Sequence, residues 1–147
     1  MKSTQAKILT ALAAATTMTG AALSLTGCAF IDKMATTSAK VWAVTYELTT
    51  DSTQSETVSN TSYRDTPSRV EGQIIARPGL LDVSTEGWRT ETLGVVTKEL
   101  SISATPPEGV RLTCKILLDG TEQIASATSA APGEAVRCAV KAPEFPS

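Results

Sequence analysis

The feature that most constrains the fold is a two-residue alternation of apolar and polar side chains that leads into an Asp-Gly pair. Side chains two apart lie on one face of a β-strand, so the alternation predicts a strand with one buried face. Asp119 and Gly120 can adopt the positive φ angles of a type I′ turn, and residues 121–128 are expected to return as a hairpin. The alternating apolar residues are Val110, Leu112, Cys114, Ile116 and Leu118.

The N-terminal half of the body shows weaker strand patterns. Residues 42–48 alternate in the same way, and residues 57–63, rich in β-branched and hydroxyl side chains, are expected to pair with them as a hairpin. Prolines and glycines then divide the chain, which leaves residues 70–76 and 80–84 as candidate short strands.

The C-terminal third predicts two further strands. One begins near Leu93 and ends at a turn over residues 105–109, with Lys98 as the exception on its apolar face. After a turn at residues 131–134, residues 136–141 alternate again. The apolar positions of the first of these strands are Val96, Leu100, Ile102 and Ala104.

These segments predict an all-β fold, and no segment of the body has a helical period. About seven short strands with turns between them favour a small immunoglobulin-like β-sandwich, with a small open barrel as the alternative. We expect the sandwich to occupy residues 41–142, followed by a tail at residues 143–147.

Two cysteines lie on the predicted apolar faces. Cys114 and Cys138 belong to separate strands of a chain that is expected to enter an oxidising compartment, so we expect them to form a disulfide. A redox dithiol or a metal site would require closer spacing or histidine ligands, and the chain has no His.

The first 27 residues are typical of a secretory signal, with a basic start and an apolar run. The sequence Leu-Thr-Gly-Cys at residues 25–28 resembles a bacterial lipoprotein box, in which cleavage precedes a lipid-modified cysteine. We therefore expect Cys28 to anchor the protein in the extracytoplasmic face of the cell membrane, with residues 28–40 as a tether. The alternative is an uncleaved anchor, since residues 8–25 reach the lower length limit of a membrane-spanning helix.

Composition argues against several classes of function. The 147 residues suit one domain, and 13 basic against 15 acidic side chains give no basic stripe for nucleic acid. Without His the usual Ser and Cys triads are excluded, and no phosphate-binding or metal-binding motif is present. We therefore expect no enzyme activity and no cofactor.

One aromatic residue is a candidate contact for a partner. Trp88 lies between Gly87 and Arg89 in a predicted loop, where Trp88 and Arg89 could be exposed, although a tryptophan more often packs in a core or loop. Carboxylate pairs such as Glu86 with Glu91 are expected to be ordinary surface charges.

The mature domain resembles the MmpS family of actinobacterial membrane proteins, which are accessory partners of MmpL transporters. The most specific feature is a Cys-x-Ile-x-x-Asp-Gly pattern at residues 114–120 with a second cysteine at Cys138. The sequences Val-Thr-Tyr-Glu-Leu-Thr at residues 44–49 and Ser-Tyr-Arg-Asp at residues 62–65 contribute as well. The resemblance implies a non-catalytic extracytoplasmic β-sandwich beside a resistance-nodulation-division (RND) transporter that exports siderophores or lipids.

The sequence is also compatible with other functions. The chain could carry a lipid or siderophore, which requires an apolar cavity, or it could be a surface antigen or envelope spacer. A hydrolase that uses carboxylates alone is a further alternative.

Replacing Cys28 with alanine should release the protein from membranes, because the acyl chains supply the anchoring energy. The measurement is the distribution of the protein between membrane and soluble fractions. Thr26→Ala, which keeps a small side chain beside the cleavage site, is the control and should stay with membranes. If Cys28→Ala also stays, the chain is held by an uncleaved anchor.

Overall fold

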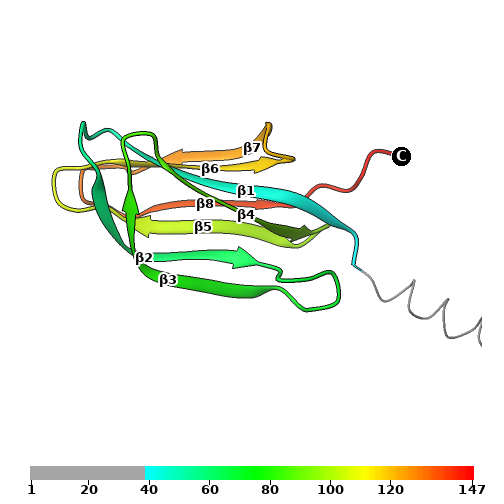
Figure 1. Ribbon diagram of the computed structural model, residues 1–147. Helices are drawn as coiled ribbons and strands as arrows, with labels where there is room; N and C mark the ends of the chain where they lie inside the picture. The colour runs from blue at the N-terminus through cyan, green and yellow to red at the C-terminus, as the bar shows by residue number, and fades with distance from the viewer. Residues whose placement is uncertain (1–38) are drawn as a thin grey trace, which may run out of the picture.

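The computed structural model describes residues 39–147, which form eight β-strands in two four-stranded antiparallel sheets (Figure 1). The expected all-β class is confirmed, with eight strands where about seven were expected. The predicted signal peptide and most of the predicted tether lie outside the described residues. The strands are β1 (Val41–Thr50), β2 (Glu56–Asp65), β3 (Ile74–Val83), β4 (Trp88–Val95), β5 (Glu99–Thr105), β6 (Leu112–Leu118), β7 (Glu122–Thr128) and β8 (Val136–Lys141).

The two sheets pack face to face, and the chain passes repeatedly from one sheet to the other. Sheet A has the order β4-β1-β6-β7, and sheet B has the order β3-β2-β5-β8. Consecutive strands pair with each other only in β2–β3 and β6–β7; every other connection between the eight strands crosses from one sheet to the other. The fold is therefore built from long-range pairings, which hold distant parts of the sequence together.

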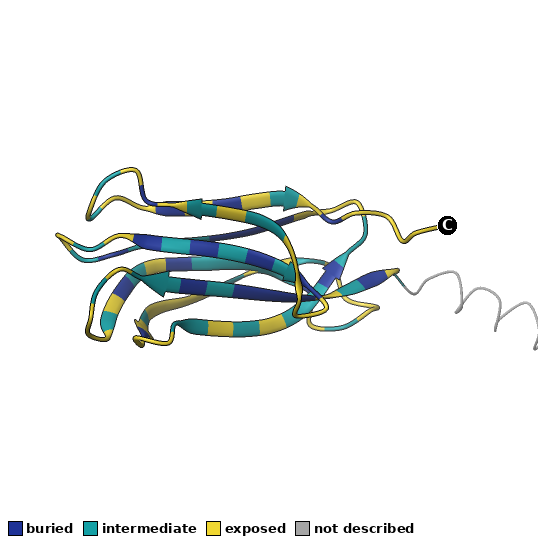
Figure 2. Cartoon of the chain, turned by 90° about the horizontal axis from the view of Figure 1, so that it is seen from above, coloured by how far each residue is buried: buried dark blue, intermediate teal, exposed yellow. Residues whose placement is uncertain are grey.

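Apolar side chains fill the space between the sheets. In β6 the buried and partly exposed residues alternate along the whole strand, as the sequence predicts (Figure 2). Each large apolar side chain buried here stabilises the fold by about 1.5–3 kcal/mol. The core includes Val44, Tyr46, Leu48, Val58, Val83, Leu100, Ile102, Leu112, Ile116, Leu118 and Val136.

The predicted disulfide between Cys114 and Cys138 is present, with 6.0 Å between the two Cα atoms. It joins β6 of sheet A to β8 of sheet B, and both cysteines are buried. In the chain-entropy model, a crosslink over this separation of 24 residues stabilises the fold by about 3.5 kcal/mol. The bond therefore fixes the spacing of the two sheets near the centre of the core.

The predicted hairpin of β6 and β7 is confirmed. Asp119 and Gly120 form its turn with φ angles of 49° and 71°, the positive values of a type I′ turn. The neighbouring strand contributes to the turn as well, because the Asp119 backbone N–H donates a hydrogen bond to the carbonyl oxygen of Ala43 (2.9 Å).

The predicted hairpin between residues 42–48 and 57–63 is wrong. β1 pairs with β4 and β6, whereas β2 pairs with β3 and β5 in the other sheet. Residues 51–55 therefore carry the chain across the sandwich. Alternation identifies the buried face of each strand, but both sheets bury a face against the same core, so it does not identify the partner strand.

The two short strands expected within residues 70–84 form one ten-residue strand, β3. It continues through Pro78 and through Gly79, which has a φ of 81°. β3 lies at the edge of sheet B, and a proline is tolerated there because one side of an edge strand has no ladder hydrogen bonds.

The strand expected to begin near Leu93 is divided between two sheets. β4 ends before residues 96–98, which turn the chain from sheet A into β5 of sheet B. Thr97 has a φ of 68°, and the exposed Lys98 donates its backbone N–H to the carbonyl oxygen of Val95 (3.0 Å). Lys98 thus departs from the apolar pattern because it belongs to the turn.

Replacing Gly94 with alanine should destabilise the fold. A Cβ atom at Gly94 would lie 2.5 Å from Val44 Cγ2 and 2.8 Å from Leu100 Cδ2, at a point where the two sheets meet. We expect the free energy of unfolding in urea to fall by about 1–3 kcal/mol. Gly72→Ala is the matched control, since no heavy atom lies within 4 Å of its Cβ position. Equal stability of the two variants would contradict this view of the core.

Candidate functional site

The lipidation site predicted at Cys28 lies outside the described residues. Within residues 39–147 there is no helix that could span a lipid bilayer. In that same part of the chain, no three His, Cys, Asp or Glu side chains come together in a way that could hold a metal ion. The candidate sites of the described residues therefore lie on the surface of the two sheets.

Trp88 begins β4 and does not lie in a loop as expected. Its ring packs against the hydrophobic core, with its centroid 6.1 Å from that of Tyr63. Arg89 is more accessible, with 64% of its side chain exposed, and it donates a hydrogen bond to the carboxylate of Glu47 on β1. The structure therefore places Trp88 largely in a packing role and Arg89 in a cross-strand ion pair.

A hollow of about 360 Å³ lies beside this ion pair. Arg89 is already engaged by Glu47, and Glu86 adds a second carboxylate to the lining, so the hollow offers little positive charge to a ligand. Because the Arg89 side chain is exposed to solvent, this ion pair contributes at most about 1 kcal/mol to stability. The hollow is lined by Glu47, Thr49, Ser84, Glu86, Gly87, Trp88 and Arg89.

A larger hollow of about 490 Å³ lies over β2 and β3 in sheet B. Its origin is an irregularity in β2, where the pairing with β3 shifts register between Val58 and Thr61 and again before Tyr63. Asn60, at the irregularity, has a φ of 51°, a conformation that asparagine tolerates better than most residues. The residues that line this hollow, hereafter the β2–β3 surface, are Ser59, Asn60, Thr61, Ser62, Arg77, Gly79 and Leu80.

The β2–β3 surface combines polar groups with an exposed apolar side chain. Leu80 is 72% exposed, while its neighbours Leu81 and Val83 pack toward the core. Arg77 is exposed on the same strand, and the hydroxyl of Thr61 is buried without a hydrogen-bond partner. Amide, hydroxyl and guanidinium groups beside an exposed leucine can bind a polypeptide, but they include no nucleophile with a neighbouring base.

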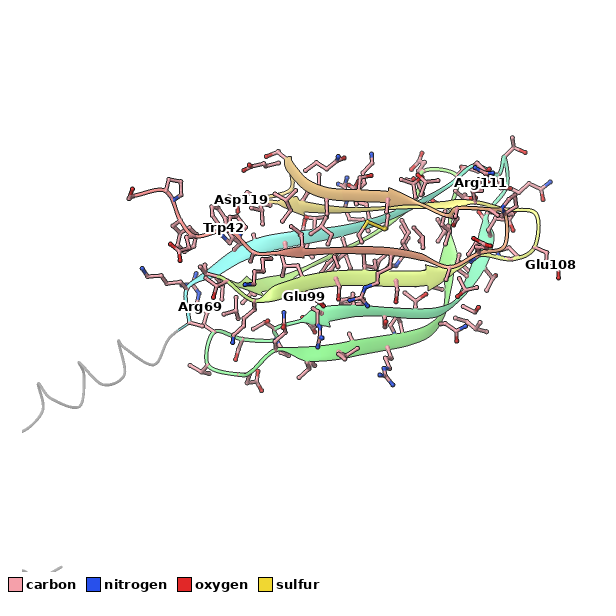
Figure 3. All side chains as sticks on the ribbon, turned by 180° about the vertical axis from the view of Figure 1, so that it is seen from behind. Trp42, Arg69, Glu99, Glu108, Arg111 and Asp119 are labelled. Carbon is pink, nitrogen blue, oxygen red and sulfur yellow. A yellow bond between two sulfur atoms is a disulfide. The ribbon has the colours of Figure 1, made fainter. Side chains whose placement is uncertain are left out.

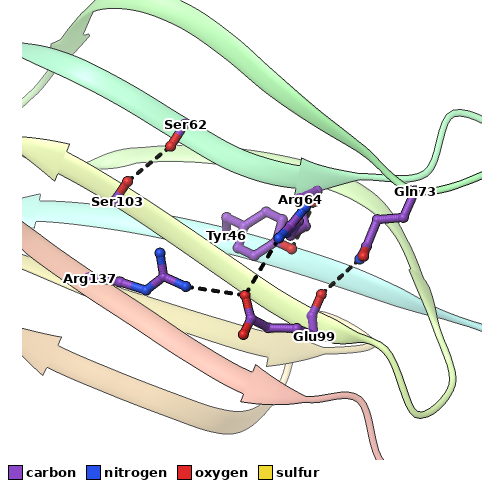
Figure 4. A network of polar contacts seen from close by, with 7 residues as sticks. All are labelled: Tyr46, Ser62, Arg64, Gln73, Glu99, Ser103 and Arg137. Atoms are coloured by element: carbon purple, nitrogen blue, oxygen red, sulfur yellow. Dashed lines mark hydrogen bonds and ion pairs between the residues drawn. The ribbon is translucent and has the colours of Figure 1, made fainter.

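Polar contacts continue from this surface across sheet B (Figure 4). The Glu99 carboxylate on β5 lies 3.1 Å from the Arg137 guanidinium and 3.8 Å from that of Arg64. Gln73 donates a side-chain hydrogen bond to the Glu99 carbonyl oxygen (2.8 Å), and Ser62 and Ser103 are joined across the strands (3.0 Å). These contacts link β2, β5 and β8 beside the β2–β3 surface.

Tyr46 connects the two sheets behind the surface. It is fully buried in β1, and its hydroxyl donates a hydrogen bond to the carbonyl oxygen of Arg64 on β2 (2.8 Å). Its ring packs 5.5 Å from that of Tyr63. Removal from solvent raises the pKa of Tyr46 well above its ordinary value, because the phenolate would be buried.

The β2–β3 surface is not predicted from the sequence. Asn60 within a run of hydroxyl and β-branched residues, together with Pro78-Gly79 in the facing segment, was the available signal. These residues indicate an irregular edge only if β2 and β3 pair with each other. That pairing is a property of the tertiary structure and is not specified by either segment alone.

Replacing Tyr46 with phenylalanine should lower stability at pH 7 by about 1 kcal/mol, through loss of the inter-sheet hydrogen bond. The difference in the free energy of unfolding between the wild type and this variant should then disappear at alkaline pH. Because the folded-state pKa of Tyr46 is raised, the unfolded chain loses that proton first, and wild-type stability falls by about 1.4 kcal/mol per pH unit above about pH 10. Urea unfolding of both proteins at pH 7 and pH 11 tests this. A stability difference independent of pH would contradict the assignment.

No family model, no curated protein and no solved structure matches the chain.

Proposed function

We propose that this chain is an extracytoplasmic lipoprotein, held on the cell membrane by acyl chains on Cys28, whose β-sandwich is a non-catalytic binding module. In this proposal the module acts as an accessory component of an RND-type export complex for siderophores or lipids. The partner class rests on the resemblance to the MmpS proteins, and the binding role rests on the surface of sheet B.

One observation carries the binding role: Leu80 is 72% exposed beside a hollow of about 490 Å³ on an edge strand. An edge strand leaves one row of backbone groups unpaired, and a partner can use them together with the neighbouring side chains. Pro78 has no backbone N–H, and a proline in an edge strand limits unspecific pairing between edges. The exposed leucine and the polar hollow then supply the specific contacts.

The carrier alternative receives less support from the described residues. A carrier for a lipid or siderophore requires an apolar cavity, and the two hollows described above are lined mostly by polar side chains. The interior between the sheets is occupied by the core side chains.

The immunoglobulin-like class is also part of the proposal. It is supported by two antiparallel sheets packed over one core, by connections that cross between the sheets, and by a buried disulfide that links them.

Site-specific photocrosslinking in native membranes tests the binding role. A benzoylphenylalanine residue placed at position 80 should crosslink to a membrane transporter of the RND class, identified by mass spectrometry. The matched control is position 123, where Gln123 is exposed on β7, the edge strand of sheet A. The adduct should form from position 80 and not from position 123.

Two outcomes would oppose the proposal. Equal adducts from both positions would show that the β2–β3 surface is not the binding site. Absence of any adduct from either position, with the protein still in the membrane fraction, would favour an envelope spacer over an accessory subunit.

A further inference from the structure

The chain enters the sandwich at one end, which is built from five segments. These segments, hereafter the entry end, are residues 39–42, the β2–β3 loop at residues 66–73, the turn at residues 96–98, the β6–β7 turn at residues 119–121 and the C-terminal residues 142–147. Figure 3 shows Trp42, Arg69 and Asp119 at this end and Glu108 and Arg111 at the opposite end. The five segments therefore form one surface at a single end of the sandwich.

Backbone hydrogen bonds hold these segments together. The N–H of Ala39 donates a hydrogen bond to the carbonyl oxygen of Arg69 (3.1 Å), and the N–H of Val96 donates one to the carbonyl oxygen of Lys40 (3.0 Å). The N–H of Ala142 in turn donates to the Lys98 carbonyl oxygen (2.9 Å). Ala39, the first described residue, is therefore held within this surface.

Exposed apolar side chains gather at and beside the entry end. Val70 is 78% exposed in the loop, Phe145 is 40% exposed in the C-terminal segment, and Ile74 is 49% exposed at the first residue of β3. Phe145 packs on Trp42, with 4.4 Å between the ring centroids, and the Trp42 indole N–H donates to the Pro143 carbonyl oxygen (2.8 Å). An aromatic pair beside exposed aliphatic residues is typical of a protein surface at the level of lipid headgroups.

Charge distinguishes this end from the opposite end. The entry end carries three basic and three acidic side chains, which balance: Lys40, Arg69 and Lys98 against Glu71, Asp119 and Glu144. The loops of the opposite end, at residues 51–55, 84–87, 106–111 and 129–135, carry four carboxylates and one arginine: Asp51, Glu86, Glu108, Glu134 and Arg111. An anionic lipid surface would repel the opposite end, whereas the balanced charges of the entry end do not oppose contact with it.

We propose that the entry end rests on the anionic lipid surface of the membrane that holds Cys28, with the side chains of Val70, Phe145 and Ile74 at headgroup depth. This inference rests on the proposed lipid anchor. Ten residues lie between Cys28 and Ala39, and this length of chain spans at most about 40 Å even when fully extended. The entry end is thus the part of the described sandwich that follows most directly on the lipid anchor.

The two tryptophans of the chain allow a direct test, because Trp42 lies at the entry end and Trp88 does not. Trp88 is paired with Leu48, six residues from Trp42 along β1, which corresponds to about 20 Å. Trp88→Phe leaves Trp42 as the reporter, and Trp42→Phe leaves Trp88 as the internal control. Each lipidated full-length mature protein is reconstituted into vesicles of phosphatidylcholine and phosphatidylglycerol that contain a headgroup-level spin-labelled lipid.

We expect the label to quench Trp42 several-fold more strongly than Trp88. Adding Val70→Glu and Phe145→Glu should reduce the quenching of Trp42 while the protein stays on the vesicles. Leu80→Glu is the matched control, because Leu80 is similarly exposed at 72% but lies away from the entry end, and it should leave the quenching unchanged.

Each contrary outcome has a distinct meaning. Equal weak quenching of both tryptophans in vesicle-bound protein overturns this inference alone and leaves the entry end to a protein partner. Failure of the wild-type protein to float with the vesicles overturns both the lipid anchor and the inference that rests on it.

Discussion

The packing of two sheets over one core, fixed by the disulfide between Cys114 and Cys138, is the constraint on which the other features depend. All but two of the connections between strands cross from one sheet to the other, so few local contacts stabilise any strand by itself. The disulfide joins an inner strand of sheet A to an edge strand of sheet B and lowers the entropy of the unfolded chain. The Tyr46 hydroxyl adds a second inter-sheet connection, to the backbone of β2.

The parts of the fold that could be predicted from the sequence are those in which one local sequence pattern specifies both the strand and the strand with which it pairs. The β6–β7 hairpin was predictable because Asp119-Gly120 specifies both the turn and the pairing. The hairpin expected between residues 42–48 and 57–63 was wrong because both strands bury one face against the same core while belonging to different sheets. Alternation alone carries no information on which of two facing sheets a strand joins.

The candidate site was harder to predict for a related reason. Trp88 drew attention as a large aromatic residue beside a glycine, but its position opposite Leu48 turns its ring toward the core. The β2–β3 surface arises where Asn60 and Gly79, far apart in sequence, interrupt two paired strands at the same level. Neither residue indicates a hollow by itself, because the opening depends on their pairing, which only the tertiary structure defines.

The two proposed surfaces constrain each other through the direction of β3. This strand starts at Ile74, beside the entry end, and Leu80 lies six residues further along, or about 20 Å at the rise of an extended strand. With the entry end against the bilayer, the β2–β3 surface faces sideways at that height above the lipid. A lipid molecule cannot reach it there, whereas a membrane protein with a folded extracytoplasmic part can. The orientation thus favours a protein as the occupant of the β2–β3 surface and leaves lipid contact to the entry end.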